Sequence, residues 1–471
     1  MEKVGILVVS YGSRESAIID ALKRSENYLV KLYIADRQRN PFNEKLAFKH
    51  AIIPDLNSKD ICKFAKTNEN ELDFVFVGPE KPIIEGLRDL IEQRTNIPVL
   101  SPTKDNAIEG SKIEQRMLFK EFAPESNPRF MIFNPKDYMN KEAVKKDVYS
   151  WLDQLDNQAV VKPDKPTAGK GVGVWGDHFF TREQLFDHFL SNFQYGSVLI
   201  EEKIDGEESS FQIFSDGKHI IPLPSVRDYK RAFNGDKGPN TGGMGSYKDI
   251  SDHLPFLTSK DRDNEISLAC RIFNKWKEKI GDNSALRGVP LYLAFMHSKH
   301  GIKILENNSR PGDPEIMNIL PLIKDDFVDI CFGMINQTLK NIRFKKAASV
   351  LTYKVPPNYG GYIKTFPELV NKKTINGPID LSKVNSLMEK NHNRIRVYPG
   401  SMEIRDSEIF ALRSRAVAVL GIGNTIEEAR QISLEGINAI NGGALWNRID
   451  IASKEHIQKS IDRMNLLRSN A

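Results

Sequence analysis

The hydrophobic pattern at the start of the chain predicts a small sheet of buried strands. Residues 4–10 are apolar almost without a break, which is typical of a parallel strand covered on both faces. A helical pattern follows as far as residue 22, and further apolar runs lie at 30–35, 74–77 and 98–101. This pattern predicts an α/β domain that ends near residue 110.

The rest of the chain predicts more strands with one polar interruption. Residues 134–158 turn polar and charged, with Trp151 and Leu155 as the main apolar positions, and indicate a helical insertion. Later strands are predicted at 159–163, 198–204, 209–215, 291–298, 302–308, 347–353 and 414–421. The pair that flanks residues 299–301 predicts a hairpin, and 425–439 predicts an amphipathic helix that Thr425 can cap.

Composition narrows the class of protein without indicating a function. The 471 residues are enough for about three domains, and the net charge of +5 is too small and dispersed to indicate nucleic-acid binding. Three widely separated cysteines fit a reducing compartment. The N-terminus lacks a signal-peptide pattern, and no apolar run approaches the ~20 residues of a membrane span. We therefore expect a cytoplasmic protein with small-molecule partners and no nucleic-acid or membrane partner.

The most unusual stretch of the sequence is 234–247, which holds five glycines and one proline. Glycine lets backbone approach a ligand closely, and a simple linker would not need Pro239 and Asn240, which direct a turn. The preceding run 227–231 has four charged residues in five positions. Backbone N–H groups beside such a cluster predict a loop that binds an anionic substrate.

A second glycine-rich segment, 164–173, follows the strand that carries Lys162. A fixed ammonium group and a loop with available N–H groups can hold a triphosphate, and Lys170 lies within that loop. The Walker sequence occurs nowhere, so a P-loop is excluded. Each lysine taken alone could be a solvated surface charge, whereas the pair together favours phosphate binding.

Two oxygen-bearing side chains on one strand predict a metal site. Glu306 and Asn308 are two residues apart in an extended segment, so both lie on the same face. A carboxylate and an amide oxygen suit Mg²⁺. Arg310 follows and can pair with a carboxylate or a phosphate. Near the N-terminus, the turn at 11–15 is either a helix-start phosphate site or a simple tight turn, with equal weight.

Four sequence runs together carry a resemblance to a known family. They are AGKGV at 168–172, IEEKIDGEES at 200–209, GPNTGGMGSY at 238–247 and ENNSRPGDPE at 306–315. The chain thereby resembles the phosphoribosylamine–glycine ligase family of the ATP-grasp superfamily. Matches at 75–80, 110–112, 414–425 and 448–450 extend the resemblance over nearly the whole chain.

The resemblance implies an α/β chain with an ATP-grasp fold in three domains. A Rossmann-like α/β domain would span 1–112, the ATP-grasp domain 113–344 with a flap subdomain at about 120–200, and an α+β domain 345–471. The family's reaction joins glycine to 5-phosphoribosylamine with ATP, through glycyl phosphate, to give glycinamide ribonucleotide, ADP and phosphate in purine biosynthesis.

The resemblance also implies roles for individual residues. The implied ATP contacts are Lys112, Lys162, Gly169, Lys170 and Gly171 at the phosphates, Glu201, Glu202 and Ile204 at the adenine, and Glu208 at the ribose. The implied substrate contacts are Arg14, Glu15, Glu80, Asp228, Lys230, Arg231, Asn240, Thr241, Gly242, Gly243 and Arg310. Arg310 and Lys170 would assist catalysis, and Glu306 and Asn308 would bind Mg²⁺ or Mn²⁺.

Some features depart from the family pattern, and other functions stay open. The first turn is poorer in glycine than usual, and Pro311 stands where an aromatic residue is common. An ATP-grasp ligase with other substrates and a non-catalytic nucleotide-binding protein are the alternatives, although the presence of Lys162, Lys170 and Glu306 disfavours the second. We expect a monomer or a weak homodimer.

Overall fold

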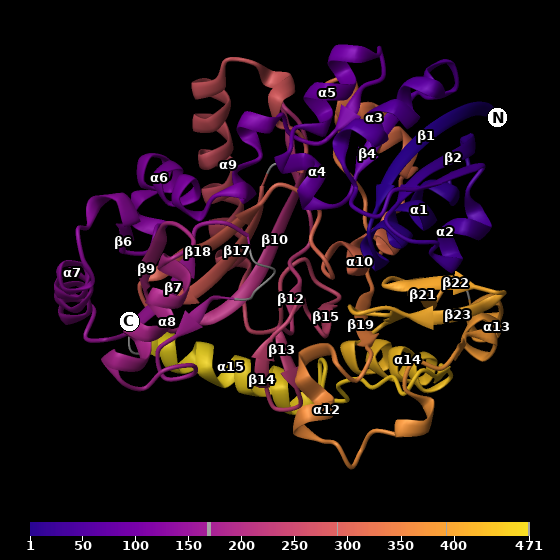
Figure 1. The fold of residues 1–471 in the computed structure, drawn as a ribbon. Coiled ribbons are helices and arrows are strands. Elements are labelled where there is room, and N and C mark those ends of the chain that lie inside the picture. The colour runs from indigo at the N-terminus through magenta and orange to yellow at the C-terminus, as the bar shows by residue number, and fades with distance from the viewer. Residues whose placement is uncertain (167–170, 290, 392, 470–471) are drawn as a thin grey trace.

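The N-terminal part is an open parallel sheet with helices on both faces (Figure 1). The computed structural model describes residues 1–166, 171–289, 291–391 and 393–469. The strand order is β3-β2-β1-β4-β5. The strands are β1 Glu2–Ser10, β2 Tyr28–Asp36, β3 Lys49–Ile52, β4 Phe74–Val77 and β5 Val99–Leu100. The helices are α1 Ser13–Lys23, α2 Pro41–Leu46, α3 Ser58–Thr67, α4 Glu80–Ile84 and α5 Leu87–Arg94. The predicted α/β arrangement of strands and helices is present, and the bounds of the domain stay a prediction.

Strand β1 is buried on both faces because successive side chains point to opposite sides. Ile6 and Val8 belong to the core that includes Ile18 of α1. Leu7 and Val9 belong to a second core with α3 and α5. Two helical layers therefore cover the sheet, which explains the unbroken apolar run in the sequence.

The flap subdomain is a small antiparallel sheet in the order β6-β9-β7-β8. Its strands are β6 Phe130–Phe133, β7 Ala159–Pro163, β8 Gly173–Val174 and β9 Val198–Glu202. Helices α7 Lys141–Gln154 and α8 Arg182–Phe193 supply the apolar residues of its core. The helical insertion predicted at 134–158 is thus α7, which buries Val144, Val148 and Leu152.

A larger sheet in the order β11-β10-β17-β18 forms the floor beside the flap (Figure 1). Its strands are β10 Glu207–Asp216, β11 Ile220–Pro222, β17 Tyr292–Ser298 and β18 Gly301–Asn308, and β16 Arg287–Gly288 also pairs with β10. The hairpin predicted at 291–308 is confirmed as β17 and β18. Helices α6 Lys112–Phe122 and α9 Ser259–Ile280 share a core with this sheet.

A third sheet joins the middle of the chain to its C-terminal third. Its order is β12-β15-β19-β24-β21. The strands are β12 Arg227–Asp228, β15 Gly245–Lys248, β19 Ala348–Lys354, β21 Ile395–Pro399 and β24 Val417–Gly423. Gly245 pairs with Thr352, and a Cβ atom on Gly245 would lie 2.5 Å from the Leu351 carbonyl oxygen. The close strand pairing therefore requires glycine at this position.

The stretch 234–247 is more regular than the loop that its composition predicts. Strands β13 Arg231–Phe233 and β14 Lys237–Asn240 form a short hairpin, and β15 starts three residues after Thr241–Gly242. Within the stretch, β15 pairs with β19, which lies more than 100 positions further along the chain, so local composition could not reveal that pairing. The glycines permit close approach within this sheet as well as toward a ligand.

The remaining elements complete the C-terminal third. They are α10 Ile316–Ile319, α11 Phe327–Ile335, α12 Tyr362–Thr365, β20 Ile379–Asp380, α13 Ser382–Lys390, β22 Met402–Arg405, β23 Glu408–Ala411, α14 Ile426–Asn438, β25 Asn441–Gly442 and α15 Lys454–Ser469. Thr425 caps α14 by accepting a hydrogen bond from the Glu428 N–H, as predicted. Helix α15 returns to the central sheet, where Ser460 donates to Glu207 at 2.9 Å. Across the described ranges, no helix is long and apolar enough to cross a membrane.

Candidate active site

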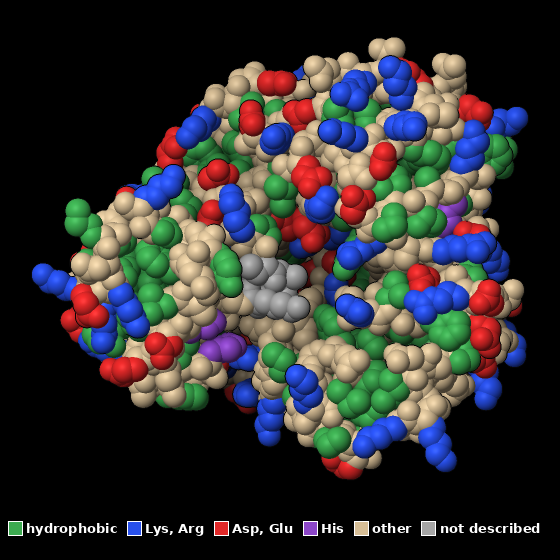
Figure 2. Space-filling view, in the orientation of Figure 1, with side chains coloured by type: hydrophobic (Ala, Val, Ile, Leu, Met, Phe, Trp, Pro, Cys, Tyr) green, Lys and Arg blue, Asp and Glu red, His purple; other side chains and the backbone are tan. Residues whose placement is uncertain are grey.

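The predicted functional residues gather where the three parts of the chain meet. Figure 2 shows a hollow near the middle of one face, with acidic and basic side chains along it. Glu306 on β18 shows this best, because its carboxylate interacts electrostatically with four cations. They are Lys112, Lys162, Lys230 and Arg310. Burial disfavours its charged form, but these four cations hold the pKa of Glu306 below its ordinary value.

Lys162 is fixed by a buried ion-pair network. Its Nζ lies 2.7 Å from Glu201 Oε2, and Arg116 of α6 meets the same carboxylate at 2.7 and 3.0 Å. Arg116 also donates to the Leu305 carbonyl oxygen at 2.6 Å, next to Glu306. Although burial opposes ionisation, Arg116 and Lys162 lower the pKa of Glu201 to about 2. Burial lowers the pKa of Lys162, and Glu201 opposes that shift. The network therefore fixes the position of the lysine beside the strand that carries Glu306.

Arg116 is a functional residue that the sequence did not reveal. It is 2% exposed, and it links α6 to β9 and β18 through one planar guanidinium group. Nothing in its local sequence distinguishes it from a surface arginine on an amphipathic helix. Its partner Glu201, implied to contact adenine, has its carboxylate committed to Lys162 and Arg116.

The adenine end of the site is the segment that leaves β9. Glu202 accepts hydrogen bonds from the Arg129 N–H at 2.9 Å and from Arg129 Nε at 2.8 Å, so its carboxylate is also occupied. The Ile204 N–H donates no hydrogen bond to any described residue. The backbone of this segment, more than its acidic side chains, is therefore available to a ligand.

The metal-site prediction rests on two side chains of β18. Glu306 and Asn308 pair with Ala294 and Tyr292 across the hairpin, so they lie on the same face. The described residues contain no group of three or more His, Cys, Asp or Glu side chains that could hold a metal ion. One carboxylate and one amide oxygen fit Mg²⁺, which takes few protein ligands and fills its other positions with water and phosphate oxygens.

A cluster of arginines and acids lies between the N-terminal sheet and the end of β18. Arg310 Nη2 lies 3.2 Å from Glu109 Oε1, and its Nε lies 3.7 Å from Glu80 Oε2. Arg14 donates to the Pro311 carbonyl oxygen at 3.2 Å, and its Nη2 lies 3.9 Å from Glu80. Glu80 is the most exposed member, with 43% of its side chain accessible. Arg14, Glu80 and Arg310 are therefore close enough to share one ligand.

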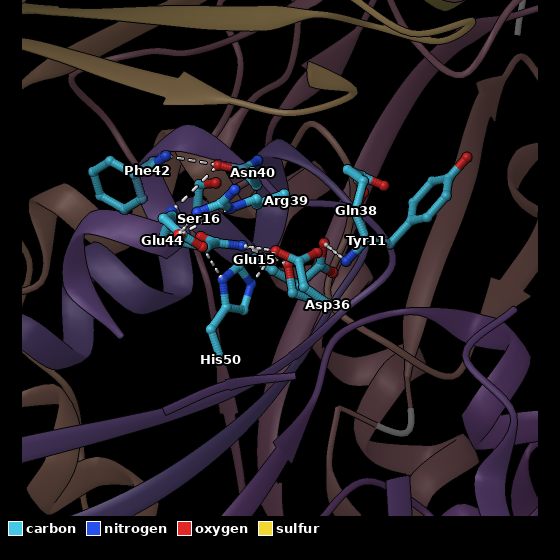
Figure 3. Close-up of polar contacts among 12 residues, drawn as sticks. Tyr11, Glu15, Ser16, Asp36, Gln38, Arg39, Asn40, Phe42, Glu44 and His50 are labelled. Carbon is cyan, nitrogen blue, oxygen red and sulfur yellow. Dashed lines mark hydrogen bonds and ion pairs between the residues drawn. The ribbon is translucent and has the colours of Figure 1, made fainter. Parts of the chain in front are cut away.

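In the first βα turn, the Glu15 side chain already accepts hydrogen bonds from backbone N–H groups (Figure 3). Its Oε2 accepts the Tyr11 N–H at 3.2 Å and the Gly12 N–H at 2.8 Å, while Oε1 meets Arg14 Nε at 2.6 Å. Burial raises the pKa of Glu15 although Arg14 opposes the rise. The N–H groups that a phosphate would need are thus occupied, which favours the tight-turn interpretation of residues 11–15. Glu15 itself is fully buried.

The neighbouring loop of the N-terminal sheet contacts the C-terminal third. Gln38 and Asn40 donate to the Gly400 carbonyl oxygen at 3.1 and 3.0 Å. Below them, His50 bridges Glu44 at 2.8 Å and Asp36 at 3.2 Å, which fixes α2 against the sheet. These contacts hold the first turn and the C-terminal third in one arrangement.

The glycine stretch is held from both sides. The N–H and the hydroxyl of Thr241 donate to the Lys230 carbonyl oxygen at 2.8 and 2.9 Å. Tyr359 accepts the Gly242 N–H at 3.0 Å, and Arg415 donates to the Gly242 carbonyl oxygen. Arg415 also pairs with Asp313 at 2.7 Å. Tyr359 and Arg415 were missed as site residues because they lie more than 100 positions from the stretch that they support.

Other predicted residues occupy the wall between the ATP and substrate regions. Lys230 forms an ion pair with Glu208. Burial lowers the pKa of Lys230, but the neighbouring acids, Glu208 above all, outweigh it and raise the pKa. Arg231 pairs with Asp177 of the flap at 2.6 Å and lies opposite Asn240 in the hairpin. Gly171 accepts a hydrogen bond at its carbonyl oxygen from Asn192 at 3.3 Å. Gly169 and Lys170 lie outside the described residues.

The fold is that of an ATP-grasp protein, and a family model of an ATP-grasp domain matches residues 120–316. Among solved structures, the phosphoribosylamine–glycine ligase of Thermotoga maritima has a TM-score of 0.72 at 23% identity and covers 95% of this chain and 100% of its own. N5-carboxyaminoimidazole ribonucleotide synthetase of the same organism has a TM-score of 0.57 at 13% identity and covers 94% and 99%. The predicted fold class is confirmed.

Sequence comparison then gives the family. Models described as "Phosphoribosylglycinamide synthetase, ATP-grasp (A) domain" and "N domain" match residues 120–316 and 4–109. The phosphoribosylamine–glycine ligase of Methanocella arvoryzae is 35% identical over 468 residues, 98% of this chain and 99% of that protein. The ligase of Methanothermobacter thermautotrophicus is 33% identical over 476 residues, 98% and 100%. The chain belongs to the phosphoribosylglycinamide synthetase family.

The Glu201 network yields a stability prediction. Glu201→Gln leaves the buried Arg116 and Lys162 without their anion, so we expect the free energy of unfolding at neutral pH to fall by about 3–5 kcal/mol. Because the pKa of Glu201 is lowered, its contribution is present above about pH 4.5 and is lost as the pH falls toward 2. Urea denaturation measures the change. Glu202→Gln, whose partner Arg129 is exposed, is the matched control and should cost under about 1 kcal/mol. Equal losses in both variants would contradict the network.

The support of the glycine stretch yields a second prediction. Arg415→Met removes the donor to Gly242 and leaves Asp313 unpaired, so we expect kcat/KM for ligation to fall about 10- to 100-fold, or about 1.4–2.8 kcal/mol. Binding of ATP, measured by calorimetry, should change little because the polar contacts of Arg415 are with Gly242, Gly243 and Asp313 and not with the adenine segment. Arg413→Met, at an exposed position two residues away, is the control. A selective loss of ATP binding would count against this role of Arg415.

Proposed function

We propose that this chain is a phosphoribosylamine–glycine ligase that joins glycine to 5-phosphoribosylamine and converts ATP to ADP and phosphate. The observation that carries the proposal is the environment of Glu306, where Lys112, Lys162, Lys230 and Arg310 surround one metal-site carboxylate. Such a concentration of fixed cations suits the transfer of a phosphoryl group. Family membership supports the choice of substrates.

In the proposed reaction, the glycine carboxylate attacks the γ-phosphorus of ATP and ADP leaves. The amine of phosphoribosylamine then attacks the acyl carbon of glycyl phosphate, and phosphate leaves. Lys112 and Lys162 neutralise negative charge on the phosphate oxygens, and the Glu201 network keeps Lys162 in place. The protein contributes mainly position and electrostatics, so the reaction needs no nucleophilic side chain.

Glu306 and Asn308 fit a divalent cation, and we propose that they hold Mg²⁺ or Mn²⁺. A bound cation would supply positive charge beside the phosphates of ATP. Asn308 is largely buried, and Glu306 stays ionised because of its cationic neighbours. The donor set of one carboxylate and one amide leaves coordination positions for phosphate and water.

The adenine and ribose would lie along the segment that follows β9. We assign adenine recognition to the backbone of residues 202–204, since the Glu201 and Glu202 carboxylates are already paired. Glu208 is positioned for the ribose, where its contact with Lys230 would adjust. The flap roles of Gly169, Lys170 and Gly171, and the catalytic role of Lys170, stay predictions.

The acceptor substrate would lie between the N-terminal sheet and the end of β18. Arg14, Glu80 and Arg310 are the proposed contacts, and Arg310 is held by Glu80 and Glu109. Burial lowers the pKa of Arg310, but those two carboxylates outweigh it and raise the pKa, so the guanidinium is a permanent cation. We assign Glu15 to the support of Arg14 and the first turn, because its carboxylate is buried and fully engaged.

The proposal also covers the cellular location and the oligomeric state of the protein. All three cysteines are present as free thiols, which fits the reducing conditions of a cytoplasm. We propose a monomer or a weak homodimer that acts on small molecules. Gel filtration with light scattering measures the mass, and a stable higher oligomer would contradict this assignment.

The substrate assignment is tested by ADP release from purified protein. We expect continuous ADP release only when both glycine and phosphoribosylamine generated in situ are present, because glycyl phosphate is consumed, and the enzyme freed for another turnover, only by attack of the amine. Other amino acids in place of glycine test the alternative of a ligase with other substrates. ADP formation with another amino acid and none with glycine would overturn the proposed function.

The metal assignment has its own test. Glu306→Gln removes the charged ligand and keeps its shape, so we expect ligation to slow by about 100- to 1,000-fold. The Mg²⁺ dependence of ATP binding, followed by calorimetry, should weaken in parallel. Glu408→Gln, an exposed acid on β23, is the matched control. Near-normal ADP production by Glu306→Gln would exclude Glu306 as a metal ligand.

A further inference from the structure

Asp228, at the end of β12, carries a buried carboxylate oxygen with no partner. Its Oδ1 accepts no hydrogen bond in the described part of the chain, and no ion pair to Asp228 is found there. Burying a carboxylate oxygen without a donor is costly, so such an atom indicates a ligand that supplies one. The sequence placed Asp228 in the substrate pocket without a specific role.

The charges around Asp228 favour a cationic ligand. The nearby acids are Glu315 and Glu208, and the nearby cations are Lys230 and Arg415. Each of these cations already has another carboxylate, since Lys230 pairs with Glu208 and Arg415 with Asp313. Burial and Glu315 raise the pKa of Asp228 well above its ordinary value. Asp228 and Glu315 are therefore both without an ion-pair partner among the described residues, and a bound ammonium group would offset the cost of a charged Asp228.

The space beside this carboxylate is narrow. A Cβ atom on Gly243 would lie 2.6 Å from Asp228 Oδ1 and 2.8 Å from Pro314 Cδ, and Gly243 has a φ of +103°. The backbone of the glycine stretch thus closes over the carboxylate and allows only a small group beside it. This is a specific structural reason for glycine at residue 243.

Asp228 also lies near the phosphate region. Lys230 follows it by two residues, and the carboxylates of Asp228 and Glu306 both raise the pKa of the Lys230 ammonium group. In glycine, a single carbon atom separates the ammonium group from the carboxylate that attacks ATP. A glycine whose ammonium group is at Asp228 can therefore place its carboxylate toward the lysines and the metal-site strand.

We propose that Asp228 binds the ammonium group of the amino-acid substrate and thereby orients its carboxylate for phosphoryl transfer. This inference rests on the proposed function and makes it more specific. Asp228 is then the residue that distinguishes an α-amino acid from a simple carboxylate such as acetate. Glu315 lies behind it and is itself held by Ser210 at 2.9 Å and by Tyr292.

The test compares wild type with Asp228→Asn, which keeps the shape and removes the charge. We expect KM for glycine to rise about 10- to 100-fold, because a hydrogen bond between charged groups is lost. KM for ATP and kcat at saturating glycine should stay within about threefold of wild type. Asp263→Asn, an exposed acid on α9, is the matched control and should match wild type.

A stability measurement separates substrate binding from a structural role. Replacing a buried carboxyl group whose Oδ1 has no partner should leave the melting temperature of ligand-free Asp228→Asn equal to or above that of wild type. Added glycine, with ATP present, should raise the melting temperature of wild type more than that of the variant. A large loss of stability in the ligand-free variant would overturn the proposal.

The remaining outcomes are also decisive. A fall in kcat with unchanged KM for glycine would assign Asp228 to proton transfer from the acceptor amine and overturn ammonium binding. Wild-type protein that does not use glycine would refute the proposed function itself, whatever the variant does. Wild type that uses glycine, together with an Asp228→Asn variant of unchanged KM, would refute only this inference.

Discussion

The active site depends on keeping several cations buried, charged and close together. Lys162, Lys112, Lys230 and Arg310 would repel one another in a low-dielectric hollow, and burial alone would favour loss of the lysine protons. Glu201 and Glu306 provide the compensating charge, and Arg116 locks Glu201 by two hydrogen bonds. This network costs desolvation free energy, but it fixes positive charge at the proposed triphosphate site without any rearrangement on substrate binding.

The need to hold these charges close together explains why all three parts of the chain contribute to the site. Arg14 and Glu80 come from the N-terminal sheet, and Arg310 comes from the end of β18. Arg415 comes from the C-terminal third and supports the glycine stretch through Asp313 and Gly242. A sheet that runs from β12 and β15 into β19 and β24 makes this support rigid. The C-terminal third therefore supports the glycine stretch, which belongs to the proposed substrate pocket.

Much of the fold could be predicted because its signals are local. The apolar run at 4–10, the hairpin at 291–308 and the capped helix after Thr425 each follow from spacing and propensity alone. The site was harder to predict from the sequence. Glu306, Asn308 and Lys162 were identifiable as types of residue on predicted strands, whereas Arg116, Tyr359 and Arg415 look like ordinary surface positions in the sequence. Their partners lie between about 80 and 190 positions away, so no local pattern marks them.

By itself, the sequence determined the strand and helix order, the family resemblance and the chemical types that gather at the site. Only the tertiary structure decided which charges are already paired. It showed that Glu15 and Glu201 are engaged within the protein and that Asp228 is left with a buried oxygen to satisfy. The reason is physical. The identity of a side chain determines which hydrogen bonds and ion pairs it can form. Whether it forms them within the protein or with a ligand depends on neighbours that only folding brings within hydrogen-bond distance.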